Sequence, residues 1–423
     1  MDKNNEFEKN GVSAFSILML GNILGAMFQI LSGRILNNLK MYGDLNTLLS
    51  VYTLTIWPTT VITFIVARYV ALYNNVVFIK NLYRKMLRFS GGLAICVVLV
   101  GGLNLRVLTE TFNISGNLVW LFLILYASSA FFLAVIGGMF QGLKKFIAYG
   151  CILLAGQATK IIAMLISIYF SYKLEIIFGI IFLGGIFTIL GSHCYLRHML
   201  GPFVKTESDI ELKYIVKYSI TVIIANCIIA FISNIDILFV KIFFENEAGE
   251  YSVATVLGKS IMYFSGAIVV VLFPMAVNAK DDTKKNQELL RKSINYNLML
   301  ATIAAFLLNI FACPIIKILY GDIYLKSIVF ILPVTLMIIP ISLITVIINY
   351  ILAINKYYFI LYFMVVIILI EIITIYFFHD NVIKSIHILG MYMWFILILS
   401  TLFLKIKINQ EKRVKNVKNN KFS

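Results

Sequence analysis

Four ionisable residues stand inside long apolar stretches of the chain, namely Lys160, Asp236, Lys259 and Glu371. An ionised side chain in the hydrocarbon core of a membrane costs about 2.5–3.5 kcal/mol on insertion scales, so such residues usually face a bundle interior or a wet cavity. Lys160 and Glu371 lie well inside their apolar segments, near the expected bilayer midplane. Basic groups at that depth are suited to an anionic substrate, and acidic groups to a coupling cation.

Asp236 and Lys259 lie on either side of an acidic turn, Glu245 to Glu250, that joins two apolar segments. They have a similar depth in this predicted hairpin and can therefore pair. Two interpretations stay open for them, a structural ion pair in which the charges neutralise each other and a functional site. Lys160 and Glu371 likewise fit either one salt bridge between the two halves of the chain or two separate roles.

The first apolar segment is unusually polar and predicts a cavity-lining helix. Its polar side chains share the segment with Gly21, Gly25 and Gly33, and they are Asn22, Gln29, Ser32 and Arg34. Arg34 lies near the end of this helix, as Arg68 does in the next one. Long basic side chains at such positions also reach the lipid headgroups, so both a cavity role and a headgroup contact stay open for the two arginines.

Sequence motifs for catalysis and metal binding are missing. Gly258-Lys259-Ser260 resembles the end of a phosphate-binding loop, but Val253 stands where that motif needs glycine, and the tripeptide falls in an apolar helix. The five cysteines occur singly, and His193 and His198 lack a metal-ligand spacing. We therefore expect no enzyme activity, no metal and no cofactor beyond Na⁺ or H⁺ as a coupling ion. Transport is the function that remains.

These residues must be positioned by membrane helices. The chain is 61% hydrophobic and only 13% charged, which excludes a soluble globular protein. Apolar runs of about 20 residues recur, and such runs cross a bilayer as helices. We predict an all-α integral membrane protein with twelve transmembrane helices, near residues 12–36, 45–72, 89–108, 117–141, 147–170, 175–196, 214–241, 251–279, 294–318, 326–353, 358–378 and 383–405.

The net charge of +16 is explained by membrane topology. The predicted loops on one side hold far more lysine and arginine than those on the other, and by the positive-inside bias this side, with both termini, is cytoplasmic. Basic stretches such as KDDTKKNQELLRKS then face the anionic inner leaflet, so no nucleic-acid partner is predicted. The N-terminus lacks the features of a removed signal peptide, and the first helix is expected to be an uncleaved anchor.

The two halves of the chain look like copies. Setting Gly43 against Gly249 aligns an acidic-flanked glycine turn and the apolar helix that follows it in both halves, and a second match sets GLKKFIAYG against AINKYYFIL. In the second register Lys160 stands opposite Glu371. We predict parallel repeats about a pseudo-twofold axis along the membrane normal. The predicted domains are a six-helix lobe at 1–200, a six-helix lobe at 201–405 and a basic cytoplasmic tail at 406–423.

Three stretches carry a resemblance to a known family. They are NIDILFVKIFFENEAGEYSVATVLGKS with LFP at 272–274, the segment ending ARYVALYNN, and FQGLKKFIAYG. The chain resembles the polysaccharide and oligosaccharide-lipid flippases of the multidrug/oligosaccharidyl-lipid/polysaccharide (MOP) exporter superfamily. This resemblance implies a MATE-like fold of two six-helix lobes around a central cavity and alternating access. Asp236, Gly249, Tyr251, Pro274 and Arg68 occupy positions of the family pattern.

The resemblance also implies a function, the flipping of an undecaprenyl-diphosphate-linked oligosaccharide repeat unit across the bacterial inner membrane for O-antigen, lipopolysaccharide or capsule synthesis. The candidate residues around the diphosphate are Arg34, Lys160, Lys259, Asn22 and Gln29. Asp236, Glu371 and Arg68 are candidates for ion coupling or structural charge pairs. Expected partners are the lipid-linked oligosaccharide, the bilayer, and the polysaccharide polymerase and glycosyltransferases of the same pathway.

Two transport alternatives stay open. A multidrug or cation antiporter of the same superfamily is favoured by the acidic residues Asp236 and Glu371. A lipid II flippase is chemically closer, but that family typically has two further helices. A membrane acyltransferase or polymerase would need a catalytic residue in a sizeable external loop, and the predicted external loops are short.

Overall fold

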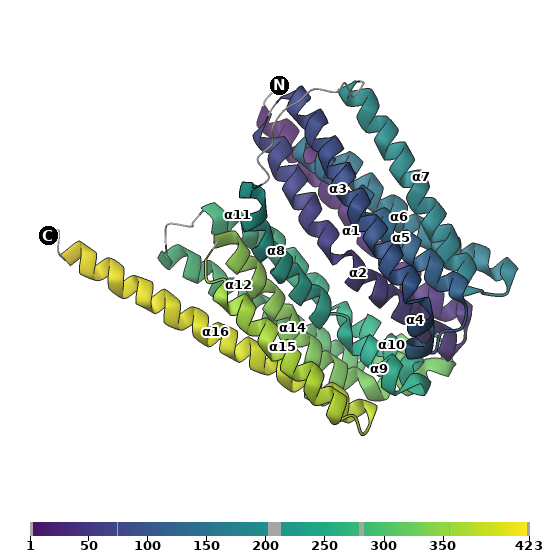
Figure 1. Cartoon of the computed structure of the whole chain (residues 1–423). Coiled ribbons are helices and arrows are strands. Elements are labelled where there is room, and N and C mark those ends of the chain that lie inside the picture. The colour runs from purple at the N-terminus through teal and green to yellow at the C-terminus, as the bar shows by residue number, and fades with distance from the viewer. Residues whose placement is uncertain (1–2, 74, 202–212, 279–282, 355, 421–423) are drawn as a thin grey trace. The chain divides into compact units, whose positions relative to one another are not determined.

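The computed structural model describes residues 3–73, 75–201, 213–278, 283–354 and 356–420 (Figure 1). The chain divides into two compact units, Met1–Ile220 and Thr221–Ser423, and each is described by itself. No strand occurs in the described residues, and the predicted all-α class is confirmed. The sequence predicts a lobe boundary at residue 200, and this boundary stays a prediction.

The N-terminal unit is built around α5 (Asn117–Gly142), which packs against α2, α3, α6 and α7. α5 is apolar on nearly its whole circumference, so it is stable only as the centre of a bundle, and Trp120 and Val135 on it are fully buried. The other helices of this unit are α1 (Lys3–Leu36), α2 (Leu39–Leu72), α3 (Val76–Leu103), α4 (Leu105–Phe112), α6 (Phe146–Ser167), the short 3₁₀ helix η1 (Ile168–Phe170) and α7 (Leu174–Leu200).

The C-terminal unit is built around α14 (Ile328–Ile354), which packs against α10, α11, α12 and α16. α8 (Lys213–Ile232) leads into this unit. The remaining helices are α9 (Ile235–Phe243), η2 (Glu245–Glu247), α10 (Ala248–Lys259), α11 (Met262–Asn278), α12 (Thr283–Ile310), α13 (Ala312–Leu319), η3 (Asp322–Ser327), α15 (Phe359–Phe377) and α16 (Val382–Asn420).

The two units repeat each other, as the duplication predicts. α5 and α14 are the central helices, and each is the fourth predicted helix of its half. The preceding helix of each half also breaks at an equivalent place. α3 ends just before α4, and α12 ends just before α13, with a single residue between them in each case, Asn104 and Phe311. α4 and α13 are both 8 residues long.

Each of the twelve predicted segments falls on helix, but several of them are broken into two. Within the described residues, nine helices are long and apolar enough to cross a membrane, or up to ten if the bent pair α8 and α9 is one span. The residues Leu20–Leu36 of α1 form a shorter apolar stretch. The chain is a multi-pass membrane protein by this measure, and the count of twelve is not confirmed.

The last predicted membrane helix, near 383–405, agrees with the candidate span Val382–Ile408, and the helix itself extends further. α16 continues to Asn420, through most of the segment predicted as a basic tail. Lysine, arginine, glutamate and glutamine have high helix propensity, and no proline or glycine occurs in this segment. The helix therefore continues beyond its apolar part.

Close packing inside the N-terminal unit gives a stability prediction at Gly138 of α5. A Cβ added there would lie 2.7 Å from the carbonyl oxygen of Thr63 and 2.7 Å from the Cβ of Val66, both on α2. We expect Gly138→Ala to lower the free energy of unfolding by about 1–3 kcal/mol relative to a matched control, because the overpacked helices must move apart.

The matched control is Gly92→Ala in α3, where an added Cβ meets nothing within 4 Å. Both substitutions gain the same helix propensity, so only the packing differs. The measurement is unfolding of the purified protein in a denaturing-detergent titration. Equal stability of the two variants would contradict the packing between α2 and α5.

Candidate functional site

Two neighbouring helices of the C-terminal unit are interrupted. α8 stops at Ile232, and α9 starts at Ile235 with its axis turned by 43°. α10, which packs against α9, stops at Lys259, and α11 starts at Met262. Interrupted membrane helices expose backbone groups and helix ends, and they are tolerated where protein or a wet cavity satisfies those groups. These breaks therefore mark a place to look for function.

Asp236 lies in the first turn of α9, directly after the first break. Its side chain is only 2% exposed. The hydroxyl of Tyr251 donates a hydrogen bond of 2.8 Å to Oδ2 of Asp236, and the hydroxyl of Thr255 lies 3.5 Å from the same oxygen. A carboxylate is also favoured at a helix N-terminus by the helix dipole. The hydrogen bonds and the helix dipole thus stabilise a negative charge at the break.

Lys259 supplies the opposite charge at the second break. Its Nζ lies 3.9 Å from Oδ1 of Asp236, and its side chain is 25% exposed. Tyr251, Thr255 and Lys259 follow one another at intervals of four residues on α10, so they lie on one face of that helix. One face of α10 therefore surrounds the carboxylate with two hydroxyls and an ammonium group.

Asp236 is only partly satisfied by these neighbours. Oδ1 is buried and accepts no hydrogen bond from any described residue, and 3.9 Å is too long for a hydrogen bond to Lys259. A carboxylate oxygen has lone pairs for further donors or for a cation. The arrangement is suited to exchange, in which a proton or a small cation takes the open oxygen when Lys259 moves away.

Glu371 of α15 is a second buried acid close to this group. It is 2% exposed, and its Oε1 has no hydrogen-bond partner among the described residues. The charges of Glu371 and Asp236 interact. α9 and α15 also meet through the ring of Phe243, whose centroid lies 6.3 Å from that of Tyr376. We call Asp236, Tyr251, Thr255, Lys259 and Glu371 the acidic cluster. It holds two acids and one base.

The N-terminal unit has no equivalent of this cluster in the repeat register that sets Gly43 against Gly249. Leu45, Leu49 and Thr53 of α2 stand opposite Tyr251, Thr255 and Lys259. α2 is also continuous where the other half breaks between α10 and α11. Since the two units otherwise repeat, the acidic cluster is a specialisation of the second one.

The remaining predicted residues lie in the N-terminal unit. Lys160 of α6 is half-buried, with its Nζ 6.0 Å from the ring centroid of Phe28 on α1. That distance permits a cation–π contact. Gln29 of α1 is half-buried, and its Oε1 is enclosed without a hydrogen-bond partner in the described residues. Asn22, Arg34 and Arg68 are exposed.

The structure thus brings together Asp236, Lys259 and Glu371 in one unit, and it places Lys160 at the contact between α1 and α6 in the other. Convergence of Arg34, Lys160 and Lys259 on one cavity stays a prediction, and so does a salt bridge between Lys160 and Glu371. Both predictions involve residues from each of the two units.

Sequence reasoning missed two features. Thr255 was not singled out, although its spacing from Tyr251 and Lys259 signals a common helix face. The second feature is the burial of Lys241, which is 2% exposed and has its Nζ 3.4 Å from Oε1 of Glu245. Within the described residues, no group of three or more His, Cys, Asp or Glu side chains is placed to hold a metal ion.

Comparisons with known proteins agree with the resemblance. A family model described as "Polysaccharide biosynthesis protein" matches residues 143–329. An inward-facing multidrug resistance MATE family transporter of the MOP superfamily is similar in structure, with a TM-score of 0.68 at 13% identity over 95% of this chain and 99% of that chain. No curated protein sequence matches significantly.

Two further solved structures are similar. The lipid II flippase MurJ, in an inward closed conformation, gives a TM-score of 0.72 at 13% identity over 94% of this chain and 89% of that chain. A MOP superfamily transporter from Pyrococcus furiosus gives 0.58 at 13% identity over 96% of each chain. The chain has the fold of these proteins, and residues 143–329 match the polysaccharide biosynthesis family model that the resemblance leads us to expect.

Proposed function

We propose that this protein is a transporter that flips an undecaprenyl-diphosphate-linked oligosaccharide repeat unit across the bacterial inner membrane by alternating access, for the synthesis of O-antigen or capsule. The observation that carries the proposal is the overlap between the polysaccharide biosynthesis match at 143–329 and the interrupted helices that hold Asp236, Tyr251 and Lys259. Both termini are cytoplasmic in this proposal, as the charge distribution indicates.

The proposed substrate has an anionic headgroup and a long lipid tail. A diphosphate must lose much of its water to cross the bilayer, and basic side chains in the bundle offset that loss. Lys160 and Arg34 of the N-terminal unit and Lys259 of the C-terminal unit are the proposed cations, with Asn22 and Gln29 as hydrogen-bonding neighbours. The tail stays in the hydrocarbon region throughout.

The acidic cluster has a coupling role in this proposal. Binding of Na⁺ or H⁺ at Asp236 and Glu371 releases Lys259 from its ion pair, and Lys259 then becomes available to the diphosphate. A ligand shifts a conformational equilibrium only by its differential affinity for the two states. The exchange of partners at Lys259 supplies such a difference. No bond is made or broken in the substrate, which fits a transporter and not an enzyme.

The proposal is tested by complementation of a strain that lacks its polysaccharide flippase. The wild-type chain is expected to restore surface polysaccharide, and Lys160→Ala is expected to reduce it by roughly tenfold, about 1.4 kcal/mol, because one charge-assisted contact to the diphosphate is lost. Lys173→Ala is the control, since Lys173 is exposed at the start of α7. Expression levels are matched by immunoblot.

Full complementation by Lys160→Ala would contradict the role of Lys160 at the diphosphate. Two other results would contradict the function itself. Rescue of a lipid II flippase mutant in place of the polysaccharide strain would favour a lipid II flippase, and drug resistance without any surface polysaccharide would favour a multidrug antiporter. These two outcomes are tested because the chain is similar in structure to MurJ and to MATE transporters.

A further inference from the structure

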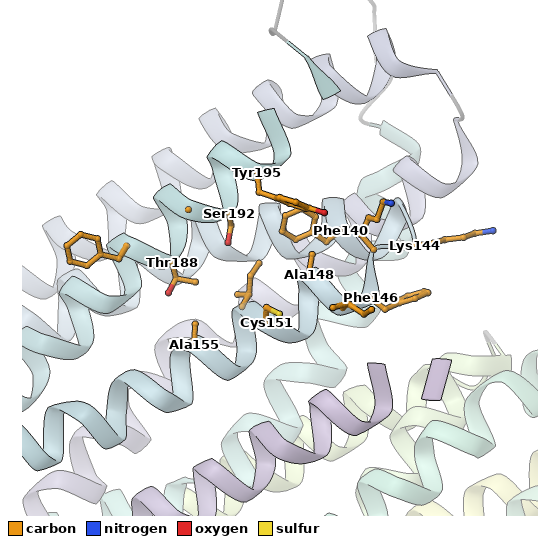
Figure 2. Close-up of a pocket in the computed structure, with 14 residues that line it drawn as sticks. Phe140, Lys144, Phe146, Ala148, Cys151, Ala155, Thr188, Ser192 and Tyr195 are labelled. Atoms are coloured by element: carbon orange, nitrogen blue, oxygen red, sulfur yellow. The ribbon is translucent and has the colours of Figure 1, made fainter. Parts of the chain in front are cut away.

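A groove opens in the N-terminal unit between α6 and α7, apart from the acidic cluster. Its volume is about 720 Å³. Figure 2 shows Ala148, Cys151 and Ala155 on α6 facing Thr188 and Ser192 on α7. Small residues normally bring membrane helices into close contact. Here they line an open space, so the sequence leaves room for a ligand between the two helices.

One end of the groove is basic. Lys144 and Lys145 line it, and both side chains are exposed. They occupy the turn between α5 and α6, which is fixed by backbone hydrogen bonds from Lys144 to Gln141 and from Lys145 to Phe140. The turn needs the left-handed conformation at Lys144, with φ of 58°. Two cations are therefore held beside the same cavity.

The start of α6 adds further donors at this basic end. Lys145 is the N-cap of α6, and no side chain caps the helix there. The N–H groups of a first helical turn have no carbonyl partner within the helix, and they attract anions together with the helix dipole. Lysine ammonium groups and free N–H groups thus point to a phosphate as the polar part of the ligand.

The rest of the groove is mostly apolar, apart from the hydroxyls of Thr188 and Ser192, and it lies between two helices that are long enough to span the bilayer. Its lining includes Ile147, Phe187 and Tyr195, whose side chains are exposed although α6 and α7 are long enough to span the bilayer. Exposed apolar side chains on a membrane span contact acyl chains. The ligand that matches a basic end and an apolar channel is an amphiphile with an anionic headgroup.

The basic end of the groove belongs to a larger basic face of the unit. The N-terminal part of α3 carries Lys80, Arg84, Lys85 and Arg88. This part packs in the same cluster of buried side chains as Phe140 and Leu196, and the hydroxyl of Tyr83 lies 2.8 Å from Nδ1 of His193 on α7. By the positive-inside bias this face is cytoplasmic, where the leaflet is rich in anionic lipid.

We propose that the groove between α6 and α7 binds one anionic diacyl phospholipid of the cytoplasmic leaflet. Its phosphate lies at Lys144 and Lys145, and one acyl chain lies along the small side chains of both helices. A lipid held there joins α6 to α7 and is not transported. The inference is independent of the transported substrate, because it rests on one unit and on charge complementarity alone.

The test uses the full-length protein in detergent, mixed with equal amounts of phosphatidylglycerol and phosphatidylcholine, and counts retained lipids by native mass spectrometry. Wild-type protein is expected to retain phosphatidylglycerol in preference to phosphatidylcholine. Lys144→Gln combined with Lys145→Gln is expected to lower the retained phosphatidylglycerol by roughly tenfold, because both headgroup charges are lost. Lys173→Gln, at the opposite end of α7, is the matched control and is expected to change nothing.

A second variant tests the apolar channel. Ser192→Phe fills the groove without touching either lysine, and it is expected to lower retained phosphatidylglycerol by a similar factor. Equal retention of the two lipids by the wild type would overturn the proposal, as would an unchanged preference in the double lysine variant. Displacement of phosphatidylglycerol by a lipid-linked oligosaccharide would also overturn it, because the groove would then belong to the transport route.

Discussion

Asp236→Asn is expected to lower transport by about 100-fold, which corresponds to a loss of about 2.7 kcal/mol. Asparagine still accepts the hydrogen bond of Tyr251, so the packing of α9 on α10 is kept. It carries no charge, however, so it neither pairs with Lys259 nor binds a coupling cation. The measurement is flipping of a fluorescent lipid-linked oligosaccharide in proteoliposomes, at matched amounts of folded protein.

Asp322→Asn is the matched control for this substitution. Asp322 also pairs with a lysine, Lys317, at 3.4 Å, but its side chain is 70% exposed. Exposed ion pairs contribute little, about 0–1 kcal/mol, so transport is expected to change less than about twofold.

A double variant separates the coupling role of Asp236 from a purely structural ion pair. In Asp236→Asn combined with Lys259→Met, neither member of the ion pair is left charged without the other, so a structural pair predicts recovery of both thermal stability and transport. A coupling site predicts recovery of stability while transport stays low. Recovery of both properties would leave the ion pair as the only function of these two residues.

The sequence predicts the charged members of the acidic cluster because ionisable residues are conspicuous in apolar segments. Asp236, Lys259 and Glu371 stand out for that reason, and hydropathy alone assigns them to helices. Their hydrogen-bonding partners do not stand out. Tyr251 and Thr255 are ordinary residues of a membrane helix, and their role depends on which face α10 turns toward α9.

The helix breaks could not be predicted from hydropathy. The apolar runs continue through Asn234, Ser260, Asn104 and Phe311, so periodicity joins each pair of helices into one. Proline, the usual signal for a break, follows only the break at Phe311, where Pro314 lies in the first turn of α13, while Pro58 and Pro340 lie inside continuous helices. Tertiary packing overrides the local signal in both cases, since neighbouring helices can satisfy the backbone at a proline.

The internal repeat does not reveal the break between α10 and α11. An alignment of apolar helices transfers length and orientation, and in this chain it places α4 opposite α13. It also treats α2 and the pair α10 and α11 as equivalent, although only the second is broken. The alignment also pairs dissimilar side chains, such as Leu45 with Tyr251.

Glu371→Gln is expected to reduce ion-driven transport by roughly tenfold or more, about 1.4 kcal/mol, and to remove its response to the imposed Na⁺ or H⁺ gradient. Glutamine keeps the shape of the side chain in α15 and loses only its charge. Asp236 and Lys259 neutralise each other, so the charge of Glu371 is the one that a coupling cation would balance. The variant therefore lacks the negative charge that attracts a coupling ion.

Stability distinguishes this effect from simple damage. Glu371 is buried with one oxygen unpaired in the described structure, so its neutralisation removes an unfavourable charge, and the melting temperature is expected to stay unchanged or rise. Glu110→Gln, in an exposed pair with Arg106, is the control and leaves both properties unchanged. A lower melting temperature together with normal gradient dependence would instead make Glu371 a packing residue. Loss of activity with a gain of stability is the pattern of a functional site. A buried acid that destabilises the fold is retained by selection where activity needs it.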